Sequence, residues 1–383
     1  MAFLYINSKG QPHRKHSYSA GLDFEQSAYK YYLRRVLGWC EKDSRGSFAF
    51  GRTLEQSIQF HHDHNGEGAI EDFKRRWLAY QGQDLKYTDK EKDWNTCLKI
   101  GTDMIRLYIA VQPTLPIPLG AASVFQREYS KEVFPNDPNY GQIEDAGKLD
   151  IVCYVDPNHP SLAKVDWNKQ IHGAIRPLIV DIKTSATDFP EQQGMAAFDT
   201  QLRRYSWLSG IRDVCLLWFK KSGLGYKKGY SATFINPVGN YQPGQECVIA
   251  KVEDKNAWVV YNDFMIDQMD KYKDEEQLNW LKQNAVLTDL DNLTRQRLQF
   301  NTGRVSEQSA EDAGRIAGRQ IVQIVNAWNT KSWPNTFGIR YPKDDRNDSY
   351  FRAFVLGDET YKQQNFIKSD EQSFDDLFLE DNQ

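Results

Sequence analysis

The sequence predicts an α/β protein with a mixed sheet flanked by helices. Apolar side chains recur at helical spacing through residues 22–108. Three short β-type runs follow within residues 121–183, and after them come a helical stretch and one more apolar run. The order β, β, β, α, β favours a sheet covered by helices.

The N-terminal third is expected to be helical. A first helix is predicted over 22–37, ending at Gly38, because glycine often follows the last helical residue. The spacing of apolar residues predicts three more helices, marked by Leu54 and Ile58, by Phe73, Trp77 and Tyr80, and by Trp94, Leu98, Ile105 and Tyr108. The proline-rich stretch QPTLPIPLG ends this region.

The middle of the chain is expected to form the sheet. The runs ASVFQREYS, KLDIVCYVD and RPLIVDIK predict three strands, and VCLLWFKK predicts a fourth. Between the third and fourth, a helix is predicted over about 195–209, with Phe198, Leu202 and Tyr205 on one face and Gly210 at its end.

The C-terminal third is less regular. A β-like region is predicted near 230–262, helices near 262–283 and 308–328, and a short β-like piece at YFRAFVL. From Ser369 onward the chain holds six acidic residues and no basic ones, which predicts a disordered tail. Three roles stay open for it: a docking peptide for a partner protein, a mimic of an anionic ligand, or a solubilising segment.

Composition excludes several classes. The net charge is only -4, and 40% hydrophobic residues are enough for a large core. No run approaches the roughly 18 apolar residues of a membrane helix, and the first residues lack the apolar stretch of a signal peptide, so a soluble, cytoplasmic protein is expected. Five cysteines without a CxxC pair predict neither a disulfide framework nor a cysteine-based metal site.

Two acids and a lysine carry the chemical signal. Asp150 lies in GKLD at the entry of one predicted strand, and Asp181 and Lys183 lie in DIK at the exit of the next. Side chains alternate along a strand, so Asp181 and Lys183 share a face, which Asp150 joins if the strands are neighbours. Two carboxylates suit Mg²⁺ or Mn²⁺, and an ammonium group offsets charge on a phosphate.

The alternative is an exposed ion pair at a strand end, which is the commoner meaning of DxK alone. The context favours a site, because the DIK acid and lysine end an apolar run. Gln201 and Tyr205 also follow at the i, i+4 spacing of one helix face. For Tyr205, core packing stays an equal alternative.

The spacing GKLD, DIK and QLRRY resembles the GxxD, DxK and QxxxY signature of RecB-like nucleases in the PD-(D/E)xK superfamily. SYSAGLDFEQSAYKYYLRRVLGW and FAFGRTLEQ resemble upstream segments of that family. The resemblance implies a restriction-endonuclease-like core over 121–230 and an N-terminal helical region over 1–120. It also implies a C-terminal extension over 231–368 before the tail at 369–383.

The resemblance also implies roles. Asp150 and Asp181 would bind Mg²⁺, for which Mn²⁺ can substitute, with the carbonyl of Ile182 as a further ligand, and Lys183 would be the catalytic lysine. Gln201 and Tyr205 would line the site. Glu55 stands where many relatives have a metal-binding histidine, so it is a candidate third ligand, with an exposed helix glutamate as the alternative.

Relatives with an iron-sulfur cluster carry a cysteine in the N-terminal helix and three near the C-terminus. Ser27 stands at the first position and KSWPNTFGIRYPK has no cysteine, which predicts that the cluster is absent. In those relatives the C-terminal segment folds back on the N-terminal helix, and composition does not show whether it does so here.

Basic residues after the proposed site suggest a nucleic-acid surface. Residues 201–230 hold one acid and seven basic residues: Arg203, Arg204, Arg212, Lys220, Lys221, Lys227 and Lys228. Interleaved aromatics suit stacking on unpaired bases. A solvated hairpin is the alternative. The run HHDH (His61, His62, His64) could hold zinc, but a solvated helix end is favoured because no partner ligands stand at suitable spacing.

The sequence therefore predicts a metal-dependent DNA nuclease, most simply an exonuclease of recombination, repair or phage DNA processing. Two alternatives remain: a structure-specific or nicking endonuclease on the same core, and a noncatalytic DNA-binding or assembly protein. Nothing in the sequence specifies the oligomeric state or separates DNA from RNA.

Overall fold

The computed structural model of the protein describes most of the chain. The described residues are 3–6, 10–41, 46–83, 85–88, 92–156, 176–185, 187, 189, 194–221, 226–238, 242–252, 257–260, 264–265, 274–289, 297–337 and 348–368.

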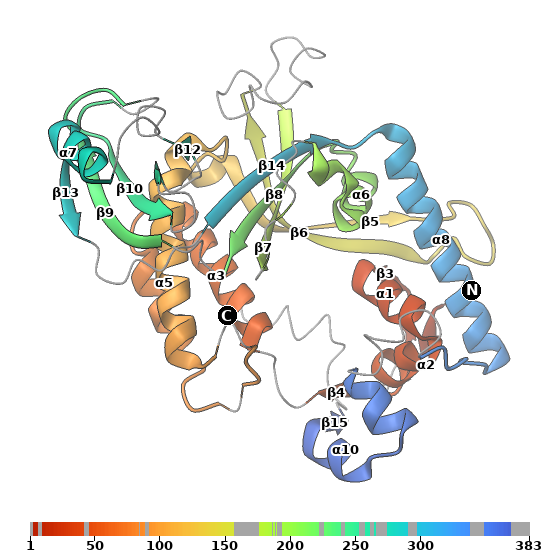
Figure 1. Ribbon diagram of the computed structural model, residues 1–383. Helices are drawn as coiled ribbons and strands as arrows, with labels where there is room; N and C mark the ends of the chain where they lie inside the picture. The colour runs from red at the N-terminus through yellow and green to blue at the C-terminus, as the bar shows by residue number, and fades with distance from the viewer. Residues whose placement is uncertain are drawn as a thin grey trace.

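A six-stranded mixed sheet forms the centre of the molecule (Figure 1). Its strands are β3 (Lys15–Ser17), β5 (Ser123–Glu132), β6 (Glu144–Val155), β7 (Arg176–Ser185), β8 (Asp213–Lys220) and β14 (Arg297–Arg304). The path across it runs β14-β8-β7-β6-β3, and β5 also pairs with β6. The neighbours β7 and β8 are parallel, whereas β6 pairs antiparallel with both β5 and β7. The predicted α/β class and all four predicted core strands are therefore confirmed.

Helices cover both faces of this sheet. On one face α3 (Gly46–Asp63), α4 (Ala69–Leu78) and α5 (Trp94–Val111) bury Phe50, Trp77 and Tyr108 in one core together with strand residues such as Val180. On the other face α6 (Thr200–Ser209) and α8 (Glu307–Thr330) pack over a second core. The alternation of β7 explains the layering, because its successive side chains enter opposite cores.

The first helix differs from its prediction. It begins earlier and breaks at Ser27, giving α1 (Tyr18–Gln26), α2 (Ala28–Tyr31) and a π-helical turn, η1 (Tyr32–Val36). The Ser17 side chain caps α1 by accepting the N–H of Ala20, and Ser27 adopts an extended backbone between α1 and α2. The apolar spacing runs through this break, so periodicity alone does not reveal it.

The helix expected over 195–209 also differs. It splits into a 3-10 turn, η6 (Met195–Phe198), and α6, which Asp199 caps through the N–H groups of Gln201 and Leu202. Phe198 therefore leaves the helical face assigned to it and is exposed. Gly210 ends α6 with a positive φ of 76°, as expected. Two short 3-10 turns, η2 (Gln112–Thr114) and η3 (Gly120–Ala122), connect α5 to β5.

A second antiparallel sheet is inserted between β8 and β14, which pair with each other. It contains β9 (Tyr226–Phe234), β10 (Glu246–Val252), β11 (Ala257–Val260), β12 (Phe264–Met265) and β13 (Ala285–Asp289), with α7 (Asp274–Asn284) packed on it. The expected boundary at 230 thus falls inside β9, and β14 of the expected extension belongs to the central sheet.

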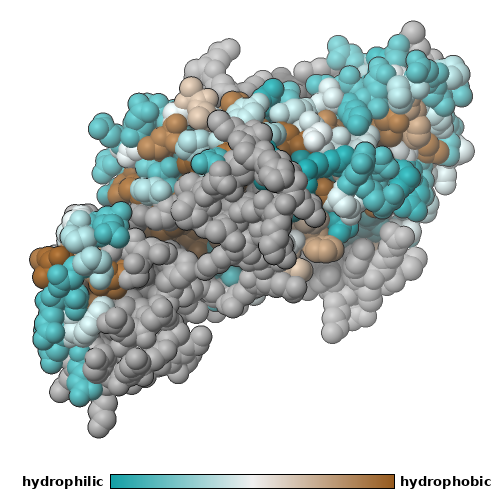
Figure 2. Space-filling view, turned by 90° about the horizontal axis from the view of Figure 1, so that it is seen from above, coloured by the Kyte–Doolittle hydropathy of each residue, from teal (hydrophilic) through white to brown (hydrophobic). Residues whose placement is uncertain are grey.

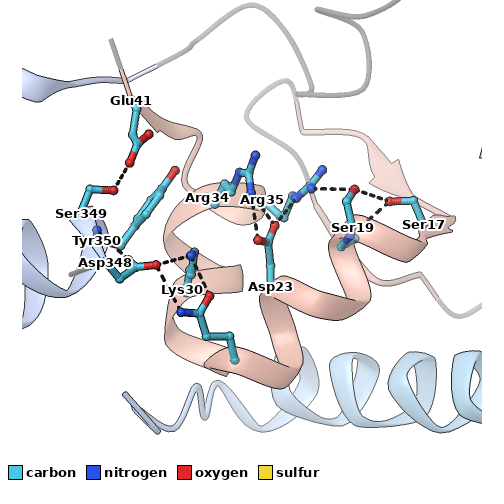
Figure 3. Close-up of polar contacts among 12 residues, drawn as sticks. Ser17, Ser19, Asp23, Lys30, Arg34, Arg35, Glu41, Asp348, Ser349 and Tyr350 are labelled. Atoms are coloured by element: carbon cyan, nitrogen blue, oxygen red, sulfur yellow. Dashed lines mark hydrogen bonds and ion pairs between the residues drawn. The ribbon is translucent and has the colours of Figure 1, made fainter. Parts of the chain in front are cut away.

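The C-terminal segment returns to the N-terminal helices, as Figure 3 shows in close-up. Asp23 accepts from Arg34 at 2.9 Å and from Arg35 at 3.0 Å, while Lys30 pairs with Asp348 across the two segments. The strand β15 (Phe366–Lys368) pairs with β4 (Trp39–Glu41), and α10 (Glu359–Asn365) precedes it. A further two-stranded sheet joins β1 (Tyr5–Ile6) to β2 (Pro12–His13).

Within this returning segment, YFRAFVL is not a strand, contrary to prediction. Its residues Phe351–Val355 form a π-helical turn, η8. The reason is packing, because Tyr350, Ala353 and Phe366 bury their side chains with Leu33 of η1. The acidic tail lies outside the described residues.

The surface is a mosaic. Figure 2 shows hydrophobic residues scattered among hydrophilic ones over the described part of one face. In the described part of the chain, no helix combines the length and apolar content that a membrane crossing requires.

Candidate active site

The two predicted aspartates converge where β6 and β7 separate. The last ladder pair of these antiparallel strands is Ile151 with Val180, and the same register would set Asp150 opposite Asp181. Instead of continuing the ladder, the backbone N–H of Ile182 donates to Asp150 Oδ2 at 2.8 Å. The site thus lies at the point where the two strands part.

The strand pairing of β6 explains why this position is open. One edge of β6 pairs with β5 at residues 144–149 and 151–153. On the opposite edge β3 pairs with residues 144–146 and β7 with residues 151–155, so neither takes residues 147–150. Gly147 lies in this interval, and a Cβ there would come within 2.9 Å of Tyr205. The glycine lets α6 approach the open edge.

Lys183 shares a face with Asp181, as the alternation predicted. Its Nζ lies 2.6 Å from Asp181 Oδ2 and donates to Gln201 Oε1 at 3.0 Å. Gln201 in turn donates from Nε2 to the Tyr205 hydroxyl at 2.6 Å. The i, i+4 pair on α6 therefore holds the lysine from the other side. Tyr205 is also buried in the second core, which confirms the core packing expected as one alternative, and its role in a site stays a prediction.

Glu55 comes from α3, on the opposite layer. Its Oε1 accepts a hydrogen bond from the side-chain amide of Gln126, so it is not a free surface glutamate. Gln126 lies on β5 between Phe125, which pairs with Ile151, and Arg127, which pairs with Leu149. The register therefore sets Gln126 opposite Asp150, but the two residues do not pair, and Gln126 has a φ of 53°. A non-glycine residue in this region is uncommon and marks local constraint. Sequence analysis missed Gln126, because nothing in a strand sequence signals its backbone conformation.

Burial and mutual repulsion raise the pKa values of the three acids. Burial is the largest cause for each, and it raises the pKa of Glu55, Asp150 and Asp181 to about 7. Among the charged neighbours, Asp181 raises the pKa of Glu55 and Glu55 raises that of Asp150. For Lys183 burial acts to lower the pKa, but the carboxylates of Asp181 and Asp150 outweigh it and raise the pKa above its usual value.

This arrangement fits a divalent cation in part. Neither buried carboxylate oxygen of Asp181 has a well-aligned hydrogen-bond donor, although Lys183 lies close to Oδ2. Asp150 and Asp181 share the ammonium group of Lys183, which leaves negative charge that a hard cation would offset. Yet within the described residues no three His, Cys, Asp or Glu side chains are already spaced to hold a metal. Asp150 and Asp181 fit as ligands, whereas Glu55 would first have to leave Gln126.

The backbone N–H of Ile182 contacts the site by its hydrogen bond to Asp150. Metal binding by the Ile182 carbonyl stays a prediction.

The predicted nucleic-acid residues separate in the structure. Arg203 lies on α6 beside the 3-10 turn, with its guanidinium carbon 5.2 Å from the centre of the Phe198 ring. Arg204 is buried and pairs with Asp145, so its prediction as a DNA contact is wrong. Arg204 follows Arg203 on α6 but points into the core. Composition alone does not distinguish a buried arginine from an exposed one.

Lys220 is half-buried at the end of β8. Lys221 is buried, with its Nζ 4.9 Å from the centre of the Phe50 ring, which removes it from the surface expected for it. Lys227 and Lys228 lie in β9, but their side chains are outside the described part of the structure.

The HHDH run is not a solvated helix end. His61 and His62 are buried, and His62 hydrogen-bonds the Tyr108 hydroxyl at 2.7 Å and the Pro118 carbonyl at 3.0 Å. His64 alone is exposed. The last turn of α3 packs His62 against Tyr108 of α5 and Phe125 of β5, and local sequence does not reveal this contact.

Comparisons with known proteins give little. No family model matches the chain, and no curated protein matches it. A solved structure described as "Crystal structure of SSO0001" is similar over 44% of this chain and 69% of that chain, with 14% sequence identity and a TM-score of 0.18. A similarity this weak carries no argument about fold or function.

Proposed function

We propose that this protein is a Mg²⁺-dependent deoxyribonuclease of the RecB-like type, acting as an exonuclease in recombination, repair or phage DNA processing. The observation that carries the proposal is the convergence of Asp150, Asp181 and Lys183 at the parting of two strands, with Gln201 holding the lysine. The proposal includes DNA as the partner and the cytoplasm as the location. It also includes docking of a replication or recombination protein on the acidic tail.

Each residue has a definite task in phosphodiester hydrolysis. Asp150 and Asp181 would hold the metal, which when bound lowers the pKa of water and stabilises the leaving oxygen. Lys183 has a raised pKa, so it stays an ammonium at neutral pH and does not serve as a general base. Its charge offsets the negative charge that develops on the phosphate.

The remaining residues position that ammonium. Gln201 accepts a hydrogen bond from Lys183 Nζ and donates one from its side-chain amide to the hydroxyl of Tyr205, which is buried in the second core. A lysine side chain has four rotatable bonds. Because Gln201 already holds its ammonium group, less side-chain entropy is lost when substrate binds.

The test is a nuclease assay on end-labelled linear duplex, single-stranded and closed circular DNA, with Mg²⁺, Mn²⁺ or EDTA. Wild-type protein and Lys183→Ala are compared with Lys74→Ala, which changes an exposed lysine on α4. We expect metal-dependent loss of linear DNA, no cleavage by Lys183→Ala, and wild-type activity in Lys74→Ala.

Digestion of linear but not circular DNA supports the exonuclease, and cutting of circles supports the endonuclease alternative. Full activity in purified Lys183→Ala would contradict the assignment of the site. Metal-dependent DNA binding without cleavage in the wild type would move the function to recognition or assembly.

A further inference from the structure

Phe198 is an exposed aromatic residue at the edge of the candidate site. Its side chain is 63% exposed, and it ends the 3-10 turn η6 directly before the cap of α6. Single exposed apolar residues are common and carry no meaning alone. Three further observations distinguish this one: a rigid backbone, a paired cation, and proximity to the lysine.

The turn that presents Phe198 is held against the central sheet. The backbone N–H of Ala196 donates to the Asn301 side chain at 2.9 Å, and that of Gly194 donates to the Thr302 carbonyl at 2.8 Å. Both partners lie on β14 and are buried. An aromatic ring on such a support loses little conformational freedom when it binds a ligand.

Arg203 provides a cation next to the ring. Its guanidinium carbon lies 5.2 Å from the centre of the Phe198 ring, and its Nε donates to the Ala197 carbonyl at 3.0 Å. Among the described residues, none accepts a hydrogen bond from its two terminal amino groups. Most of the Phe198 side chain is exposed, so its ring is accessible to a ligand beside this cation. An open ring beside a cation with spare donors matches a base with its phosphate.

The pair lies close to the proposed chemistry. Gln201 follows Phe198 by three residues, so their Cα atoms are at most about 11 Å apart. Gln201 accepts the hydrogen bond of Lys183. A nucleotide resting on Phe198 would therefore stand near the cleaved phosphate in the strand.

We propose that Phe198 and Arg203 form a nucleotide subsite that stacks an unpaired base and binds its phosphate beside the scissile bond. This inference rests on the proposed nuclease function. Only an unpaired base presents an open face, so the subsite favours single-stranded DNA and frayed ends over the interior of a duplex.

The test compares cleavage of single-stranded DNA by wild type, Phe198→Ala, Phe198→Leu and Phe198→Tyr. Leu356→Ala is the matched control, since Leu356 is 66% exposed on the returning C-terminal segment. We expect kcat/KM to fall roughly 5- to 150-fold in Phe198→Ala, the range for loss of one stacked base. Phe198→Leu keeps apolar volume without a ring and should fall similarly, while Phe198→Tyr and Leu356→Ala should stay within about 3-fold of wild type.

A scan of one abasic nucleotide along the strand identifies the stacked base. Wild-type kcat/KM should drop at one position, and on that substrate Phe198→Ala should show no further loss, as a shared interaction requires. Arg203→Gln should lower kcat/KM on every substrate and flatten its salt dependence.

Wild-type cleavage with an unchanged Phe198→Ala and Phe198→Leu would overturn the subsite and leave the nuclease in place. A loss in Phe198→Ala that is equal on normal and abasic strands at every position would also overturn it, because the effect would then be structural. A wild type that cuts no DNA would instead overturn the proposed function.

Discussion

The three acids of the candidate site should make the metal-free protein less stable at neutral pH than at mildly acidic pH. Burial and neighbouring charge raise the pKa of Glu55 from 4.5 to about 7. The folded state then holds a proton between these pH values that the unfolded state has released, so stability falls as pH rises through this window. A shift of this size corresponds to roughly 3 kcal/mol at full effect. Partial solvent access and coupling to the other acids reduce it, and we expect about 1–3 kcal/mol.

The perturbation is Glu55→Gln. The glutamine keeps an oxygen that can accept the hydrogen bond of Gln126 and removes the charge that repels Asp150 and Asp181. In EDTA the variant should therefore gain about 1–3 kcal/mol over wild type at pH 8 and nearly nothing at pH 4.5. The gain should shrink in Mg²⁺, since the metal stabilises wild type by roughly 1.4 kcal/mol for each tenfold of concentration above its Kd.

The assay is urea unfolding of both proteins from pH 4.5 to 8, in EDTA and in Mg²⁺. Taking the difference between the two proteins cancels the titration of buried histidines common to both. Glu67→Gln, at an exposed glutamate beyond α3, is the control and should show no difference. Equal pH profiles for wild type and Glu55→Gln, or a loss of stability in the variant at pH 8, would refute the reasoning.

Two other predictions follow from the packing. Gly147→Ala should push Tyr205 away, since the added Cβ would lie 2.9 Å from its ring. The variant should lose about 1–3 kcal/mol of unfolding free energy and most DNA cleavage. Gly51→Ala is the control, because its added Cβ meets nothing closer than 3.6 Å, and it should be as stable as wild type in the same urea titration. Burial, with His61 nearby, lowers the pKa of His62 to about 4. The unfolded state therefore takes up this proton first, so the contribution of His62 to stability should fall from about pH 6.5 toward pH 4, opposite in sign to that of Glu55. His62→Gln should reduce the fall in unfolding temperature between about pH 6.5 and pH 4. An unchanged fall in the variant would show that other groups cause it.

Much of the fold follows from local pattern. The four core strands, the three helices α3 to α5 and the long α8 all lie where their periodicity placed them, because each buries one regular face. The misses fall where packing outweighs local preference. YFRAFVL has the composition of a strand yet forms a π-helical turn, because Tyr350 and Ala353 pack in a cluster that includes Leu33, more than 300 positions away.

The sequence by itself determined which side chains share a face over short distances. Lys183 meets Asp181 because strands repeat every two residues, and Gln201 meets Tyr205 because helices bring i and i+4 together. The tertiary structure alone decided which elements meet. It brought Glu55 of α3 to a glutamine on β5, buried Arg204 while leaving Arg203 outside, and left the ring of Phe198 in solvent. The physical reason is that periodicity is a property of one segment. Burial and convergence depend on contacts between segments far apart in the chain, which no local pattern encodes.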